Sequence, residues 1–240
     1  MSNACLKLDV PVALAVYEYL RATFPNQQDH ILGNLACMYH AMAFDSGKEH
    51  DEMLQKAEKT FLEALASDGV TAAIKMDYVT FLVHLHRYDD AIPLLKEIMD
   101  SESKNLTGRN GYGKIERQNF DDENILKEID LHGKLDTVTA AFAYYVLTRI
   151  YCITQRLSDA EAIQSHFLVL CNETLLAGRG NASDHASAYS LLGYTYMMMQ
   201  NYTEAMQAFG RAVQLDSDYT LAQENRGLCE ALQLSMTVYD

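Results

Sequence analysis

Apolar and small residues recur at helical spacing along most of the chain, most clearly at about residues 186 to 219. The large side chains there stand three, four or seven positions apart, as on one face of an amphipathic helix. The run consists of Tyr189, Leu192, Gly193, Tyr196, Tyr202, Ala205, Phe209 and Ala212. Its small members, Gly193, Ala205 and Ala212, leave room for two antiparallel helix backbones to cross closely. The pattern therefore predicts a tightly packed helix pair in this region.

The same arrangement recurs in weaker form in the rest of the chain. A half unit contains Ala13, Tyr17, Leu20 and Pro25, at the spacing of the second helix of a pair. A second unit, with a longer turn around Asp45 to Glu52, contains Leu35, Ala36, Tyr39, Ala57, Phe61 and Ala64. A third unit contains Tyr78, Val79, Leu82, Tyr88, Ala91, Leu95 and Ile98, and a fourth contains Tyr144, Leu147, Tyr151, Leu157 and Ala160. The fourth departs from the pattern at Gln164, where an aromatic residue is expected. Repeats of this kind predict stacked helix pairs that share a continuous core.

These positions resemble the tetratricopeptide repeat, whose pattern W-x2-L-G-x2-Y…A-x3-F has a period of about 34 residues. Tyr189 replaces the usual Trp, and Ser217 stands where the family usually has Pro. The resemblance covers most of the chain outside residues 101–136. It implies an all-α fold, a right-handed α-solenoid of antiparallel helix pairs, with about ten helices in a single domain over 1–240. A C-terminal capping helix is expected at about 219–234.

Residues 101–136 interrupt the repeats, and we expect this insertion to be a surface excursion. It contains a segment, Gly108 to Ile115, that falls one residue short of the phosphate-binding P-loop pattern. A P-loop requires a Ser or Thr hydroxyl for Mg²⁺ where Ile115 stands, and a buried strand before the glycines. We therefore expect a solvated glycine-rich loop and no nucleotide site, with a short helix at Asn124 to Ile129.

Composition and charge narrow the class of protein. Hydrophobic residues make up 49% of the chain and charged residues 22%, which is typical of a globular protein that buries a core. The sequence contains no apolar stretch of membrane-spanning length and no N-terminal leader pattern, so we expect a cytoplasmic protein without a membrane segment. The net charge of −14 disfavours nucleic acid, because such binding needs clustered Lys and Arg. It favours a basic or apolar protein partner instead.

The sequence lacks a specific catalytic or metal-binding constellation. The five cysteines are scattered singly, which predicts buried thiols and neither disulfides nor a zinc site. His84 and His86 stand two residues apart, so on a helix they point in nearly opposite directions and cannot hold one ion. Cys171 and His166 would lie on different faces of a helix and do not form a nucleophile and base. We expect no enzyme activity, no metal and no cofactor.

The resemblance implies a concave groove lined by the first helix of each repeat. In the clearest repeat the groove positions are Leu191, Tyr194, Met197 and Met198, and in the fourth unit they are Phe142, Tyr145, Arg149 and Cys152. Such a wall suits an extended segment or an amphipathic helix, because Met adapts its shape and Tyr offers area with a polar tip. We predict partner contact by Tyr145, Arg149, Leu191, Tyr194, Met197 and Met198. The alternative is that the insertion or a neighbouring repeat covers them.

The resemblance also allows a negative prediction. Some tetratricopeptide domains hold the C-terminal carboxylate of heat-shock chaperones between Lys, Asn and Arg side chains of the groove. The corresponding positions in this chain are Gly33, Asn34, Cys37, Met76, Asp77 and Thr80. This set has no cation, and the acidic chain would repel an acidic tail, so we do not expect chaperone tails to bind.

The predicted function is a non-catalytic scaffold or adaptor that holds a peptide or helix of another protein in the groove. Two alternatives remain open. In the first, the protein is a structural subunit of a larger assembly and binds through its edges or its convex face. In the second, the insertion at 101–136 carries the partner or ligand site, and the helices only support it.

Overall fold

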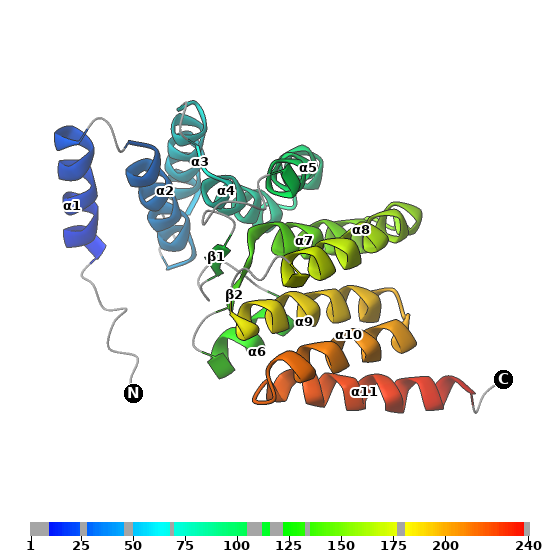
Figure 1. Cartoon of the computed structure of the whole chain (residues 1–240). Coiled ribbons are helices and arrows are strands. Elements are labelled where there is room, and N and C mark those ends of the chain that lie inside the picture. Colours follow the sequence, from blue (N-terminus) through cyan, green and yellow to red (C-terminus); the bar gives the residue numbers. More distant parts are fainter. Residues whose placement is uncertain are drawn as a thin grey trace. The chain divides into compact units, whose positions relative to one another are not determined.

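The structure is a computed structural model of the 240-residue chain. It describes residues 10–24, 28–45, 50–67, 70–104, 112–115, 122–132, 135–176 and 181–237. These ranges contain eleven helices and two short strands (Figure 1). The helices are α1 (Val10–Thr23), α2 (Gln28–Asp45), α3 (His50–Leu65), α4 (Ala72–His84), α5 (Tyr88–Lys104), α6 (Glu123–His132), α7 (Thr139–Ile153), α8 (Leu157–Leu176), α9 (Ala182–Met198), α10 (Tyr202–Leu215) and α11 (Thr220–Thr237). The strands are β1 (Tyr112–Ile115) and β2 (Leu135–Val138).

The chain divides into two compact units, Met1–Leu85 and His86–Asp240. The first unit contains α1 to α4, and the second contains α5 to α11 with the two strands. The boundary falls within the third repeat, between α4 and α5. The expectation of a single domain over 1–240 therefore stays a prediction.

Aromatic packing joins α3 to α4 in the first unit. The ring of Phe61 lies 5.4 Å from that of Tyr78 and 5.6 Å from that of Phe81, measured between centroids. α2 also packs closely on α4, because a Cβ added at Gly33 would lie 3.1 Å from the side chain of Ile74. The long turn expected around Asp45 to Glu52 is partly helical, since α2 ends at Asp45 and α3 begins at His50.

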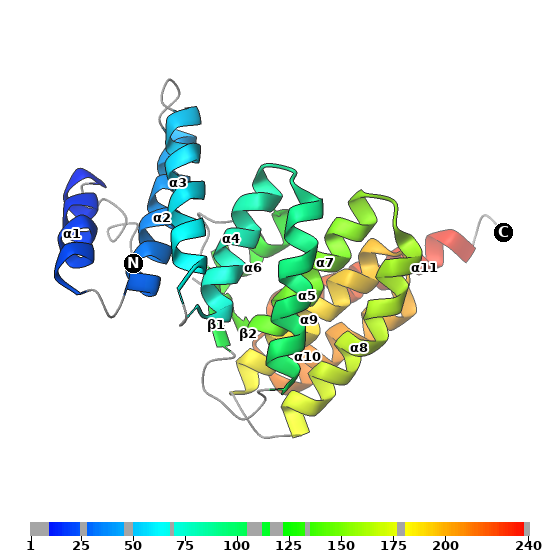
Figure 2. The same cartoon turned by 90° about the horizontal axis from the view of Figure 1, so that it is seen from above.

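The predicted helix pair in the clearest repeat is confirmed by α9 and α10 (Figure 1). A Cβ added at Gly193 of α9 would lie only 2.7 Å from the ring of Phe209 in α10. Contacts that short do not occur, so glycine is required where the two helices cross. α11 packs on the other side of α10 and confirms the helix expected at about 219–234. α7 packs against α5, α8 and α9 (Figure 2).

Three turns between helices share one backbone conformation. His86, Gln155 and Gln200 have φ values of 56°, 58° and 61°, in the left-handed region. After Gln155 and Gln200 the next amide donates to the carbonyl five residues earlier, over 2.7 and 2.9 Å, which ends α7 and α9 in the same way. Gln155 and Gln200 therefore occupy equivalent positions, and aligning them fixes the register between the fourth unit and the clearest repeat.

The insertion carries more structure than expected. Its predicted short helix is confirmed by α6. Within the glycine-rich segment, Tyr112–Ile115 form β1 in place of a loop, and residues 108–111 lie outside the described residues. β1 pairs with β2 in an antiparallel ribbon, with Tyr112 opposite Val138 and Ile115 opposite Leu135. The ribbon joins segments that are distant in sequence and too short to show an alternating pattern, so local propensity alone does not reveal it. The fold is an all-α helical repeat, and this ribbon is its one departure within the described ranges.

Candidate functional site

The predicted groove wall lies on α7 and α9 in the second unit. Tyr145, Leu191 and Tyr194 are buried, so our expectation that they line an open groove was wrong. The rings of Tyr145 and Tyr194 meet edge to face at 6.4 Å, and Tyr194 packs in the same way on Phe209 at 5.3 Å. These side chains form the packed core between neighbouring repeats.

Segments outside these two repeats account for part of this burial. The amide of Asn225 in α11 donates a hydrogen bond of 2.9 Å to the hydroxyl of Tyr194. Next to Tyr145 lies Asp122, the residue that precedes α6. Burial first, and then the charge of Asp122, raise the pKa of the Tyr145 hydroxyl well above its ordinary value, so this hydroxyl stays protonated. The alternative that the insertion or a neighbouring repeat covers these positions therefore describes Tyr145 and Tyr194.

Arg149 is engaged within the chain. Its Nε lies 2.9 Å from a carboxylate oxygen of Asp122, in a pair whose side chains are 21% and 7% exposed. The other carboxylate oxygen of Asp122 accepts hydrogen bonds from the amides of Asn124 and Ile125 and so caps the start of α6. Ile125 and Ile129 of α6 are buried. Arg149 of α7 thus anchors the residue that caps the start of α6.

The remaining predicted contacts stay accessible. Met197 and Met198 are half-buried at the end of α9, just before the turn at Gln200. The turn register places Arg149 and Tyr194 at the same repeat position, six residues before Gln155 and Gln200. The same register aligns Cys152 with Met197, and Ile153 with Met198.

This register identifies apolar residues that our sequence analysis did not propose as contacts. Ile153 and Leu157 are large hydrophobic side chains that remain exposed on either side of the α7–α8 turn. We call the group Ile153, Leu157, Met197 and Met198 the turn-end patch. Ile153, Met197 and Met198 lie at the corresponding ends of α7 and α9, which pack against each other, and Leu157 begins α8. The signal that would have found it is the position of Gln155 and Gln200, because aligning them aligns Ile153 with Met198.

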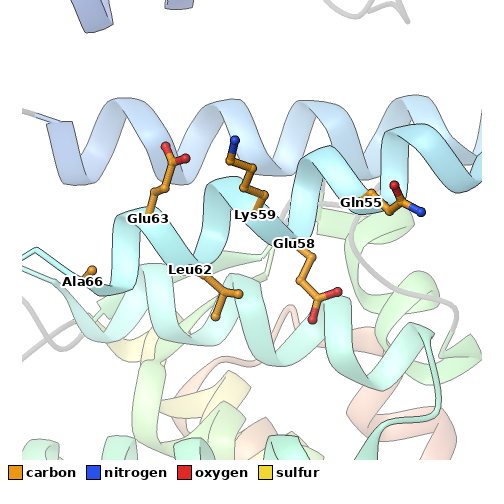
Figure 3. A pocket seen from close by; sticks show the side chains of 6 residues that line it. All are labelled: Gln55, Glu58, Lys59, Leu62, Glu63 and Ala66. Carbon is orange, nitrogen blue, oxygen red and sulfur yellow. The ribbon is translucent and has the colours of Figure 1, made fainter.

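A separate open hollow of about 540 Å³ lies along α3 in the first unit. It is lined by Gln55, Glu58, Lys59, Leu62, Glu63 and Ala66 (Figure 3). Glu63 also pairs with Arg21 of α1 at 2.8 Å. The lining of this hollow combines one exposed leucine, Leu62, with acidic and basic groups and offers no reactive arrangement.

His84 and His86 each interact with a different residue and do not form a pair. His84 bonds His40 of α2 with 3.0 Å between ring nitrogens, whereas His86 lies 2.9 Å from the hydroxyl of Tyr88. Burial first, and then His84, lower the pKa of His40 to about 4. Within the described ranges no group of three or more His, Cys, Asp or Glu is placed to hold a metal ion.

The cysteines show no sign of activation. Cys171 is fully buried, and burial raises the pKa of its thiol far above the ordinary value, so it stays protonated. Cys229 is buried as expected, but Cys37 and Cys152 are only partly buried, which corrects the expectation for these two. Cys5 lies outside the described residues.

None of the helices in the described ranges has the length and apolar character needed to cross a bilayer.

Comparison with known proteins supports the repeat assignment. Residues 186–219 match the tetratricopeptide repeat family, and these residues comprise most of α9, all of α10 and the connection to α11. No curated protein sequence matches the chain. One similar solved structure is the crystal structure of BtubC (BKLC) from P. vanneervenii. It is 17% identical, with 97% of this chain and 91% of that chain covered and a TM-score of 0.49, and this likeness adds nothing to the assignment.

Proposed function

We propose that this protein is a non-catalytic interaction scaffold that binds a segment of a partner protein at the turn-end patch. The observation that carries the proposal is that apolar surface stays accessible at the matching ends of α7 and α9, which pack against each other. Ile153 and Leu157, on either side of the α7–α8 turn, are exposed, and Met197 and Met198 are partly exposed. Exposed apolar groups that gather on one surface are typical of protein contact sites. Flexible Met side chains adapt to the shape of a bound helix or strand.

The six residues first predicted to contact a partner now have different roles in the proposal. Met197 and Met198 contact the partner directly. Tyr145, Leu191 and Tyr194 support the surface from within, because they are buried. Arg149 anchors the start of α6 to α7 through Asp122.

The partner segment that suits this surface is apolar or amphipathic and carries basic residues around its apolar side chains. The chain has 33 acidic and 19 basic residues, so its field attracts a basic segment and repels an acidic one. An acidic chaperone tail is therefore a poor ligand. A cytoplasmic location is part of this proposal.

The test is affinity capture with a double variant, Ile153→Glu and Met198→Glu, followed by mass spectrometry of the recovered proteins. Both side chains are at least partly exposed, so the double variant should fold, which circular dichroism checks. Val169→Glu on α8 is a matched control, because Val169 is also an exposed apolar residue. We expect a partner that the parent and Val169→Glu recover and the double variant loses. Recovery of the same partner by all three would overturn the proposed surface.

The second candidate, binding through the edges of the array, is favoured by a specific observation. The first helix, α1, exposes Val12, Val16 and Tyr19 along one side. This face lies in the first unit and is distinct from the turn-end patch.

A further inference from the structure

α1 is an apolar helix that the described chain leaves uncovered. Only two of its 14 residues, Glu18 and Arg21, are charged. Both bond towards the next helices, Glu18 to the hydroxyl of Tyr39 at 3.3 Å and Arg21 to Glu63 at 2.8 Å. None of the α1 side chains that the structure describes is buried. An apolar helix face is normally buried, so the exposed apolar side of α1 calls for a cover.

The sequence register identifies α1 as the second helix of an incomplete repeat. Ala13, Tyr17 and Leu20 have the same spacing as Ala205, Phe209 and Ala212 of α10. Val16 then takes the place of Ala208. Ala208 is 5% exposed, because α10 has neighbouring helices on both sides, whereas Val16 is 49% exposed. The position that a first helix normally covers is therefore open on α1.

α11 is the counterpart of α1, because it takes the position of a first helix and no second helix follows it within the described residues. Gly227 follows Gly193 by 34 residues, one repeat period. Phe209 packs so closely on Gly193 that a Cβ there would lie 2.7 Å from its ring, whereas a Cβ at Gly227 would meet nothing within 4 Å. An exposed glycine inside a helix costs about 1 kcal/mol relative to alanine. Nothing within the described chain accounts for glycine at this position.

We propose that α1 of one copy packs on α11 of a second copy and completes a repeat between two chains. In this contact the ring of Tyr17 lies over Gly227, as the ring of Phe209 lies over Gly193. The side chains around the two glycines support this assignment. α11 has Gln223 and Glu230 at the positions of Tyr189 and Tyr196 in α9, and α1 has tyrosine at the position of Phe209. The Tyr17 hydroxyl can donate to such polar groups, whereas the phenyl ring of Phe209 cannot.

The contact is head to tail, because it joins two different surfaces. Each copy therefore keeps one free α1 and one free α11 after the first contact, and association continues into longer chains or a closed ring. The contact does not use the turn-end patch, so the scaffold proposal and this one succeed or fail independently.

Two variants separate the two halves of the contact. Val16→Glu places a charge on the open face of α1 and leaves α11 intact. Gly227→Leu blocks close approach to α11 and leaves α1 intact. Neither change disturbs the folded chain, because Val16 is half exposed and Gly227 has open space beside it. Val169→Glu, at a residue that is also 49% exposed, is the matched control.

Sedimentation equilibrium of the full chain provides the test, with thermal unfolding as the check on folding. We expect the mean mass of the parent and of Val169→Glu to rise with concentration. Val16→Glu and Gly227→Leu should each remain at the chain mass of 27.0 kDa. Mixing these two variants should restore association but stop at twice the chain mass, because each contributes one intact surface.

Four results would overturn the proposal. A parent that stays at the chain mass at all concentrations would exclude a second copy as the occupant. Association of Val16→Glu by itself would mean that α1 is not used, and association of Gly227→Leu by itself would mean that α11 is not used. Monomeric single variants whose mixture also stays monomeric would exclude pairing between the two surfaces.

Discussion

Arg149 and Asp122 form the ion pair that joins the repeats to the insertion, with 2.9 Å between Nε and a carboxylate oxygen. Asp122 is almost fully buried and also caps α6, so one carboxylate serves both the ion pair and the helix start. The pair therefore links the start of α6 to α7, and its loss should affect the insertion before the repeats.

Replacement of Arg149 tests this link. Arg149→Met leaves the buried carboxylate of Asp122 without its cation, which should lower the free energy of unfolding by about 3 kcal/mol. Hydrogen exchange of the α6 amides should accelerate more than that of α9 or α10. Urea unfolding and exchange monitored by mass spectrometry measure the two effects.

A second change distinguishes an unpaired charge from lost packing. Asp122→Asn in the Arg149→Met background removes the unpaired charge, so the double variant should be more stable than the sum of the two single losses suggests. Arg156→Met is a control, because its pair with Asp159 is exposed and its removal should cost less than about 1 kcal/mol. Additive losses would show that the pair is not coupled.

The left-handed backbone conformation of Gln200 predicts that glycine at this position stabilises the folded protein. At a φ of 61° a side chain is strained, so Gln200→Gly should raise the free energy of unfolding by about 0.5 to 1 kcal/mol. Gln200→Val should lower it, because branching at Cβ increases the strain. Gln207→Gly, on the exposed side of α10, should be destabilising by about 1 kcal/mol. Equal effects of glycine at positions 200 and 207 would refute the strain argument.

The repeats could be predicted from sequence because their contacts are local. Gly193 and Phe209 belong to adjacent helices, and the short spacing between them carries the packing signal. The burial of Tyr145 and Tyr194 could not be predicted in the same way. It involves Asp122 and Asn225, and each of these lies outside the repeat that contains the tyrosine it contacts. Periodicity shows which face of a helix is apolar but not which other segment of the chain covers that face.

The histidines illustrate the same limit. His84 and His86 are neighbours in sequence, yet His84 bonds His40, 44 residues away. Contacts between helices α2 and α4 depend on the path of the chain in space, which spacing along one helix does not describe. The turn-end patch could be predicted in part from the sequence, because aligning Gln155 with Gln200 places Ile153 and Met198 at one repeat position.

The buried histidine predicts a dependence of stability on pH. The folded protein holds the pKa of His40 at about 4, below the ordinary value of 6.5, so the unfolded chain binds a proton that the folded chain does not. This contribution to stability is fully present above pH 6.5 and is lost as the pH falls towards 4. The slope reaches at most about 1.4 kcal/mol per pH unit. His40→Gln should flatten the profile measured by urea unfolding, whereas His166→Gln at an exposed site should not.

Gly193 and Gly227 stand 34 residues apart and form a matched pair for the last prediction. Gly193→Ala should destabilise the chain by about 1 to 3 kcal/mol, because the new Cβ would lie 2.7 Å from the Phe209 ring and overpack the core. Gly227→Ala should stabilise an isolated chain by about 0.5 to 1 kcal/mol, because alanine favours the helix and its Cβ meets nothing within 4 Å. Thermal unfolding at low protein concentration measures both changes without self-association. If both substitutions destabilised the chain, Gly227 would, like Gly193, be packed closely against another part of the same chain.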